Sequence, residues 1–234
     1  PLYTMKDAIA SVELFSSVNY RKRVPVVDGA EVRFRDAGHI LGSSFVELFV
    51  RENGREKKVV FTGDVGRKNL PVLHDPETIE EADILITEST YGNRLHADVT
   101  KAQDKLAGII NETYARGGKI IVPAFSVGRT QEIVYTLHQL INRKAIPSLP
   151  MYVDSPLSVN VTQIFRMHPE CFDRETLSFL YEGGDPFGFK RMTYVRTADE
   201  SRRLNTIRMP CVIISSSGMC EVGRILHHLK NNIE

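Results

Sequence analysis

The sequence predicts an α/β protein, and two features of its apolar pattern support this class. Short apolar runs, typical of strands buried in a parallel sheet, occur at residues 84–86, 119–123, 151–153 and 212–214. Helical stripes, in which apolar residues recur every three or four positions, occupy residues 99–110 and 133–141. Strands that alternate with helices form a mainly parallel sheet with helices on its faces. Ligand sites in such folds lie beyond the carboxyl ends of the strands.

Nearer the N-terminus the pattern indicates a helix followed by a hairpin. Residues 4–18 have helical spacing, and residues 24–34 have the character of extended chain. Residues 44–50 alternate apolar and polar side chains, as a half-buried strand does. A turn is predicted at 52–55 and a return strand at 58–62.

The change from hairpin pattern to strand–helix alternation predicts a domain boundary near residue 90. We therefore expect two domains, at residues 1–90 and 91–234. Residues 165–205 are polar and show no clear period, so we expect irregular structure there. From residue 223 the sequence returns to helical spacing.

Composition narrows the class of protein. The chain has 234 residues and a formal net charge of +1, so it has no global basic field of the kind many nucleic-acid binders carry, although a local basic groove would not change this sum. Its three cysteines are far apart and form neither a disulfide framework nor a cysteine zinc site, which suits a reducing cytoplasm. No apolar run approaches the ~18 residues of a membrane span.

Two short strings place a metal-binding side chain beside glycine at the end of an apolar run. Residues 36–43 read DAGHILGS and contain His39, and residues 61–67 read FTGDVGR and contain Asp64. Imidazole and carboxylate are good zinc ligands. Because His39 precedes one strand of the predicted hairpin and Asp64 follows its partner, both are expected at one edge of a sheet. Each also has a structural explanation: His39 as a hydrogen-bonded loop residue, and Asp64 as a turn cap.

Together with TESTYG at 87–92, these strings resemble the metallo-β-lactamase superfamily and, within it, the β-CASP nucleic-acid hydrolases. The resemblance continues in the family's order and approximate spacing through IVPAFSVGR, YVDSPL, SSSGM and GRILHHLK, at residues 121–129, 152–157, 215–219 and 223–230. It covers roughly the whole chain. It implies part of a metallo-β-lactamase domain of the αββα type at 1–90. At 91–234 it implies a β-CASP domain, truncated at its C-terminus, with a mainly parallel sheet flanked by helices.

The resemblance also implies roles for three residues. Asp64 matches the carboxylate that bridges two zinc ions, and His39 matches a ligand of one of them. Glu88 matches an acid that pairs with a histidine, which helps to protonate the leaving oxygen. A carboxylate at a strand end can also be purely structural. Asp64 and Glu88 are thus the candidate catalytic residues, and His39 and Asp64 the candidate metal ligands.

The superfamily's leading metal signature, His-x-His-x-Asp-His, is absent from the sequence, and so are the family's two C-terminal histidine strings. We therefore expect the chain to be the central part of a longer protein. Such a fragment would carry an incomplete zinc site and would be inactive alone, while the intact protein would hold two zinc ions.

Serine-rich loops at predicted strand ends are candidates for binding phosphate. Ser155 precedes a predicted helix, and Ser215, Ser216, Ser217 and Gly218 follow a predicted strand. Backbone N–H groups and hydroxyls at a helix start make an anion site. The same loops can also be plain helix caps that bind nothing.

Two arginines are candidates for the same role. If Ser126 is an N-cap, Arg129 falls in the first turn of the next helix, where the helix dipole disfavours a cation. Its partner would be either a carboxylate such as Asp154 or a nucleic-acid phosphate. The same two alternatives, a carboxylate partner or a phosphate, apply to Arg224, for which the sequence signal is weaker. His227 and His228 are interpreted as solvated or capping residues, and His96 as a target for mutation.

The resemblance favours a zinc-dependent phosphodiester hydrolase, a ribonuclease that acts on single-stranded RNA. No membrane partner is expected, and the sequence does not decide whether the protein forms a homodimer. One alternative is a non-catalytic β-CASP scaffold in RNA processing, although the presence of both His39 and Asp64 counts against it. The other is a thioesterase or lactonase of the same superfamily, although the Gly-Arg and Ser-Gly-Met strings count against that.

Overall fold

The computed structural model of the protein describes residues 2–95 and 99–233, and the chain divides into two compact units. The first unit contains the chain up to Ala37, then Ser44–Asp64 and Glu77–Glu88. The second contains Gly38–Ser43, Val65–Pro76 and the chain from Ser89 onward. The chain therefore passes between the units several times. The assignment of two family domains that divide at residue 90 stays a prediction.

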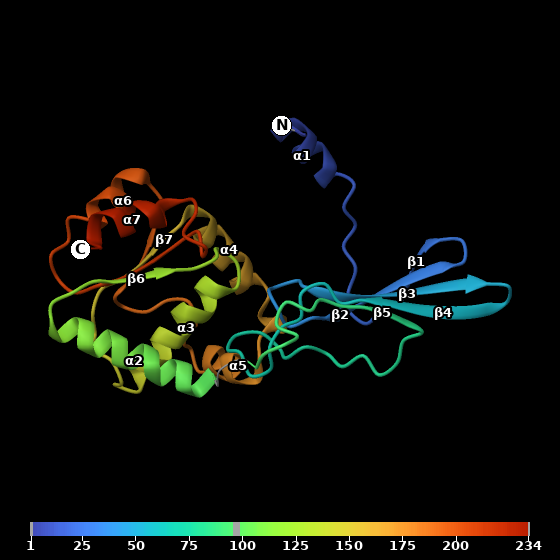
Figure 1. The fold of residues 1–234 in the computed structure, drawn as a ribbon, viewed down its shortest axis with the longest axis horizontal. Coiled ribbons are helices and arrows are strands. Elements are labelled where there is room, and N and C mark those ends of the chain that lie inside the picture. The colour runs from blue at the N-terminus through green and yellow to red at the C-terminus, as the bar shows by residue number, and fades with distance from the viewer. Residues whose placement is uncertain (1, 96–98, 234) are drawn as a thin grey trace. The chain divides into compact units, whose positions relative to one another are not determined.

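The first unit is a five-stranded sheet of order β1-β2-β3-β4-β5 with one helix (Figure 1). Strands β1 to β4 are antiparallel, and β5 pairs parallel to β4. The elements are α1 (Met5–Val12), β1 (Val24–Val27), β2 (Ala30–Asp36), β3 (Ser44–Glu52), β4 (Arg55–Phe61) and β5 (Ile84–Ile86).

The predicted hairpin between β3 and β4 is confirmed. Glu52 pairs with Arg55, which leaves the two-residue turn Asn53–Gly54. Both turn residues have positive φ, 51° and 75°. A turn of this kind matches the twist of the strands it joins, and asparagine and glycine are the residues that tolerate it.

A buried carboxylate lies at the centre of this sheet. On β3, Phe45, Glu47 and Phe49 point to one face and are buried, and Glu47 is 0% exposed. Arg33 and Lys58 bond the Glu47 carboxylate from the two neighbouring strands, with Lys58 Nζ 2.7 Å from its Oε1. Burial raises the pKa of Glu47, but the hydrogen bonds from Arg33 and Lys58 outweigh it and bring the pKa to about 2.

This depressed pKa predicts a loss of stability in acid. A carboxylate whose folded pKa lies below its unfolded value stabilises the fold above the unfolded pKa. Its contribution, about 3 kcal/mol for a shift from 4.5 to about 2, should disappear as the pH falls from 4.5 through 2. Urea unfolding between pH 2 and 6, with Glu47→Gln for comparison, measures it. Equal pH slopes in the wild type and the variant would show that Glu47 is not the responsible group.

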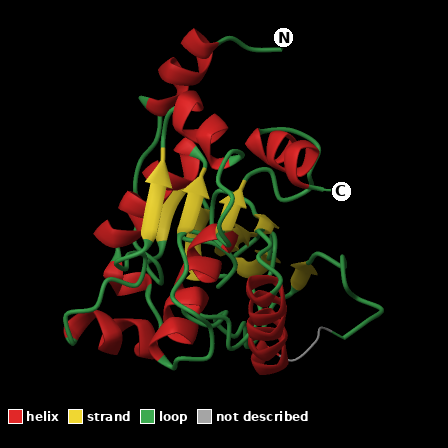
Figure 2. Cartoon of the chain, turned by 90° about the vertical axis from the view of Figure 1, so that its left-hand side faces the viewer, coloured by secondary structure: helices red, strands yellow, loops and turns green. Residues whose placement is uncertain are grey.

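The second unit is a parallel sheet of order β6-β9-β7-β8 with helices on both of its faces (Figure 2). The predicted α/β class and the mainly parallel sheet are therefore confirmed. The strands are β6 (Ile120–Pro123), β7 (Met151–Asp154), β8 (Met192–Val195) and β9 (Val212–Ser215). The helices are α2 (Val99–Ala115), α3 (Arg129–Asn142), α4 (Pro156–Met167), the short 3₁₀ turn η1 (Pro169–Cys171), α5 (Arg174–Tyr181), α6 (Ala198–Leu204) and α7 (Arg224–Asn232).

The core of the second unit explains why its strands are continuous apolar runs. On β9, Val212 and Ile214 pack into the larger core with Val134 and Leu137 of α3. Ile213, between them, packs into a second core against Leu204 of α6. Both faces of the strand are covered, so every position is apolar.

The expectation of irregular structure at 165–205 is wrong. This stretch holds the end of α4, then η1, α5, β8 and α6. Helices α5 and α6 are short and begin at side-chain caps, Asp173 and Thr197, rather than showing a long apolar stripe. The sequence signal was the capping box of Thr197 and Glu200. In the described part of the chain, no helix has both the length and the apolar character that crossing a bilayer requires.

Candidate functional site

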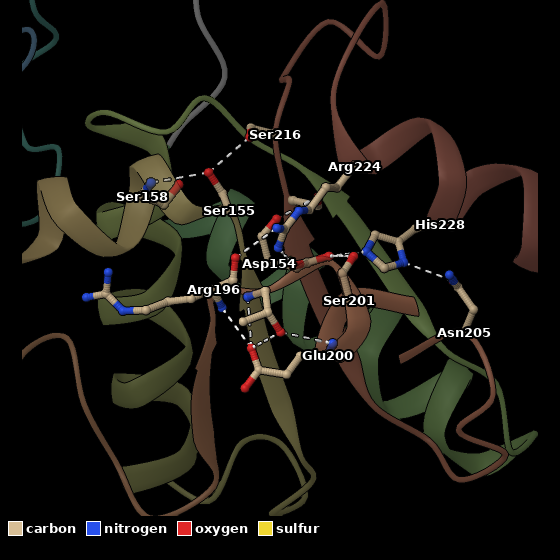
Figure 3. Close-up of polar contacts among 12 residues, drawn as sticks. Asp154, Ser155, Ser158, Arg196, Glu200, Ser201, Asn205, Ser216, Arg224 and His228 are labelled. Atoms are coloured by element: carbon tan, nitrogen blue, oxygen red, sulfur yellow. Dashed lines mark hydrogen bonds and ion pairs between the residues drawn. The ribbon is translucent and has the colours of Figure 1, made fainter. Parts of the chain in front are cut away.

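The carboxyl ends of the parallel strands bring three serine loops together. Ser155 follows β7, Ser216 follows β9 and Ser126 follows β6 by three residues. The Ser155 hydroxyl lies 3.1 Å from the Ser126 hydroxyl and accepts a hydrogen bond of 3.1 Å from the Ser216 hydroxyl (Figure 3 shows Ser155 and Ser216). It also accepts the backbone N–H of Ser158, as an N-cap does. We call Ser126, Ser155 and Ser216 the serine cluster.

The loops that follow β7 and β9 lie at one edge of the sheet, as expected, but the role of Ser126 differs from the one considered for it. Ser126 does not cap α3, whose N-cap is Gly128 with no side-chain hydrogen bond. Its hydroxyl turns to Ser155 instead. Three hydroxyls and the start of α4 therefore gather at one place. Hydroxyl groups and helix N-termini are both donors suited to phosphate oxygens.

A second polar network lies beneath this edge and is centred on Asp154, the last residue of β7. Asp154 is 0% exposed. Its carboxylate accepts hydrogen bonds from Ser201 Oγ at 2.5 Å, Arg224 Nη1 at 2.6 Å and His228 Nε2 at 2.6 Å (Figure 3). Burial raises the pKa of Asp154, but these three hydrogen bonds together lower it below its ordinary value. Asp154 therefore joins α6 and α7 to the central strand as a carboxylate.

The network continues from His228 to Lys119. The ammonium of Lys119 can only donate, and it donates to Asn232 Oδ1 at 2.8 Å. Asn232 Nδ2 in turn donates to Asn205 Oδ1, which lies 2.9 Å from His228 Nδ1. The interpretation of His228 as a solvated residue is wrong, since it is fully buried, whereas His227 is exposed as expected.

The two candidate arginines have carboxylate partners. Arg129 is the first residue of α3 and pairs with Glu132 at 2.7 Å, not with Asp154. Arg224 pairs with Asp154 and also donates to the carbonyl of Arg196 at 2.8 Å. The Arg224 side chain is 22% exposed and that of Arg129 is 54% exposed. Arg129 is thus the more accessible cation.

Glu132 lies largely buried beside this helix start. Burial raises its pKa, although the cations of Arg129 and Arg67 and the ring of His39 act in the opposite direction. A cavity of about 200 Å³ adjoins it, lined among others by Arg67, Arg129 and Thr136.

His39 lies in the second unit, in a loop that touches the start of α3. Its backbone N–H donates to the Ser43 hydroxyl at 3.1 Å. Gly128 has φ of 77°, and a Cβ there would lie 2.9 Å from Ile40 Cγ2 and 4.0 Å from the His39 carbonyl. Only glycine permits this approach. The chain thereby seats the His39 loop against the N-terminus of α3.

Asp64 and Glu88 lie in the first unit, each after one of two parallel strands. Asp64 follows β4 and Glu88 follows β5, so both leave the same end of the sheet. Thr62 links them, because its N–H donates to the Ile86 carbonyl at 3.0 Å and its hydroxyl accepts the Glu88 N–H at 3.4 Å. The convergence of Asp64 with His39 stays a prediction.

The described residues do not by themselves complete a metal centre. Among them, no three histidine, cysteine, aspartate or glutamate side chains are grouped so that they could hold one ion. His39 and Asp64 have the right ligand chemistry, but zinc in proteins takes three or four ligands. His96 lies outside the described residues.

Comparison with known proteins identifies one family domain in this chain and several similar nucleases. The Beta-Casp domain matches residues 130–234. A ribonuclease of Thermus thermophilus is 34% identical over 200 residues, which cover 86% of this chain and 45% of that protein. An RNase J-like protein of Methanocaldococcus jannaschii is 33% identical over 97% of this chain and 52% of its own length. An endoribonuclease of Schizosaccharomyces pombe is 30% identical over 95% of this chain and 28% of its own length.

The chain thus spans about half, or less, of the length of these curated relatives. The matched domain contains α4, β7 and β9, which carry most of the serine cluster, and also α7, which carries Arg224 and His228. The order of motifs along the sequence and the parallel sheet agree with the match. Residues 130–234 therefore form a Beta-Casp domain, and the chain is similar along most of its length to proteins named ribonuclease, RNase J-like protein and endoribonuclease.

Proposed function

We propose that the full-length protein hydrolyses phosphodiester bonds in RNA in a metal-dependent reaction. The observation that carries this proposal is the serine cluster, in which hydroxyls from three loops meet at the carboxyl edge of a parallel sheet. Ligands of α/β proteins bind at such edges. The relatives named ribonuclease and endoribonuclease make RNA the substrate class of choice.

In this proposal, backbone phosphates of single-stranded RNA bind along the serine edge. Ser216 supplies a hydroxyl, and the buried Ser155 holds it in place by accepting its hydrogen bond. Ser215, Ser217 and Gly218 shape the loop that holds Ser216. Arg129, whose side chain is exposed, supplies a positive charge at this edge. Arg224 acts indirectly, because its guanidinium is engaged by Asp154 and by a backbone carbonyl. It anchors the start of α7 next to the loop that follows β9.

Zinc is the metal we propose, with His39 and Asp64 as two of its ligands, since imidazole and carboxylate both suit this ion. Glu88 is proposed to orient the group that protonates the leaving oxygen. We also propose a cytoplasmic location, because the three cysteines are few and far apart in the sequence, which suits a reducing compartment.

Replacement of Asp64 by asparagine tests the proposal. It removes a charged ligand while keeping the side chain's shape, so RNA cleavage by the full-length protein should fall by about 100-fold or more. Zinc content, measured on the same samples, should fall as well. Asp28→Asn, at an exposed aspartate of the same unit, is the matched control and should leave both unchanged.

Two results would contradict the proposed function. Full RNA cleavage by the Asp64→Asn protein would remove Asp64 from the reaction. Hydrolysis of a thioester or lactone by the wild type, with RNA left intact, would assign the protein to another class of hydrolase in the superfamily.

A further inference from the structure

An aromatic ring is exposed at the same edge as the serine cluster. Phe125 lies between β6 and α3, and 53% of it is exposed, whereas Ala124 before it is buried. Its backbone is fixed, because its carbonyl accepts hydrogen bonds from the Thr130 hydroxyl at 2.7 Å and the Thr130 N–H at 3.3 Å. A large apolar side chain on such a fixed backbone remains in contact with water. A single exposed residue of this kind is ordinary on a surface, so its setting has to carry the argument.

The ring of Phe125 rests against the loop that follows β9. A Cβ atom at Gly218 would lie 2.8 Å and 3.0 Å from two of the ring carbons. Any residue but glycine at 218 would therefore displace the ring. The absence of that Cβ lets the ring lie close to the loop backbone, where it is supported from one side.

Polar groups that recognise the sugar–phosphate backbone lie next to this ring. Ser126 is the next residue and belongs to the serine cluster. Arg129, four residues on, holds its exposed guanidinium against Glu132. An aromatic ring beside hydroxyls and a cation is the combination by which proteins bind single-stranded nucleic acid. The ring stacks on a base while the polar groups hold phosphates.

The same segment touches the loop of the candidate metal ligand. Gly128, three residues after Phe125, packs against Ile40 and approaches the His39 carbonyl. A base that stacks on Phe125 would therefore belong to a nucleotide held near His39.

We propose that Phe125 is a stacking platform for one base of single-stranded RNA that lies along the serine edge. This inference rests on the proposed RNA substrate. It adds a contact that any of the four bases can make, since every base has a π-face. It also gives Gly218 a role, which is to leave room for the ring.

Binding of a short oligouridylate by the full-length protein tests this inference, with all variants in an Asp64→Asn background to prevent cleavage. Phe125→Ala and Phe125→Leu should each raise the Kd about 10-fold or more, because neither side chain stacks. Phe125→Trp should keep the Kd within about 3-fold. Met167→Ala, which truncates an exposed apolar residue at the opposite end of α4, is the control and should leave the Kd unchanged. The slope of log Kd against log salt should be the same in all variants, since no charge is removed.

Two further measurements identify the stacked base. The chain contains no tryptophan, so Phe125→Trp adds a fluorophore that this segment lacks. Its emission, taken as the difference from wild type, should be quenched by RNA. In an oligonucleotide with one abasic position, moved along the strand, a single position should weaken wild-type binding to the level of Phe125→Ala. The Phe125→Ala protein should be insensitive at that position.

Wild-type affinity in Phe125→Leu, or an unquenched tryptophan at 125 under saturating RNA, would overturn the inference and indicate a docking surface for a protein instead. Failure of the otherwise unaltered Asp64→Asn protein and of the wild type to bind RNA would overturn the proposed substrate itself. The two failures are therefore distinguishable.

Discussion

Replacement of Asp154 by alanine is expected to lower the free energy of unfolding of the second unit by about 3–5 kcal/mol, the range for removing one partner of a buried ion pair. Asp154 is fully buried, and Arg224, His228 and Ser201 all donate to its carboxylate at 2.5–2.6 Å. The alanine variant would leave these donors desolvated and without an acceptor. Because they belong to α6 and α7, both helices should loosen from the sheet.

Urea unfolding monitored by circular dichroism measures this effect. Asp199→Asn is the matched control, because Asp199 also pairs with an arginine at 2.5 Å on α6, but its side chain is 79% exposed. Its substitution should cost less than about 1 kcal/mol. A double-mutant cycle with Arg224→Ala should show a coupling energy above about 1 kcal/mol. Additive effects of the two substitutions would mean that the ion pair does not hold the helices.

The serine cluster could be predicted because it depends on local rules. Each of its loops follows a run of apolar residues, and parallel strands place their carboxyl ends at one edge. No knowledge of the helix packing was needed to place Ser155 and Ser216 together. Ser126 was considered only as a possible cap of the next helix. The N-cap of α3 is instead Gly128, two residues later, and the Ser126 hydroxyl lies against that of Ser155.

The partner of Arg224 could not be predicted from sequence, whereas that of Arg129 could. Arg224 meets Asp154 across 70 positions of the chain, and this contact depends on how α7 lies on the sheet. Arg129 had a carboxylate one turn away at Glu132, which is a local pair that the spacing i,i+3 already offered. Asp154 was a second possible partner for Arg129, but its carboxylate accepts hydrogen bonds from Arg224 and His228 of α7 instead.

The burial of His228 had a signal that sequence reasoning missed. Ile225 and His228 are three residues apart on α7, so they share a face of the helix, and both are fully buried. The adjacent pair His227–His228 therefore divides between the exposed and the buried face. A histidine three residues after a buried isoleucine is a candidate for a buried polar partner.

In the first unit, Glu47→Gln is expected to lower the free energy of unfolding by about 3–5 kcal/mol. The carboxylate of Glu47 accepts bonds from Arg33 and Lys58 and lies 3.4 Å from Arg35 Nε. Glutamine preserves the shape but carries no charge, so three partly buried cations would face one another across a neutral group. The mutual repulsion of these cations and the loss of their ion pairs with Glu47 both lower the free energy of unfolding.

The sheet offers its own control for this prediction. Glu56 also pairs with two arginines, Arg23 at 3.0 Å and Arg51 at 3.5 Å, but its side chain is 35% exposed. Water and salt screen these ion pairs, so Glu56→Gln should lower the free energy of unfolding far less than Glu47→Gln does. Urea midpoints measured in low and high salt separate the two sites, because the Glu47 effect should persist at 1 M salt while the Glu56 effect disappears. Equal losses at both positions would mean that burial does not strengthen the Glu47 cluster, since exposure is the main difference between the two glutamates.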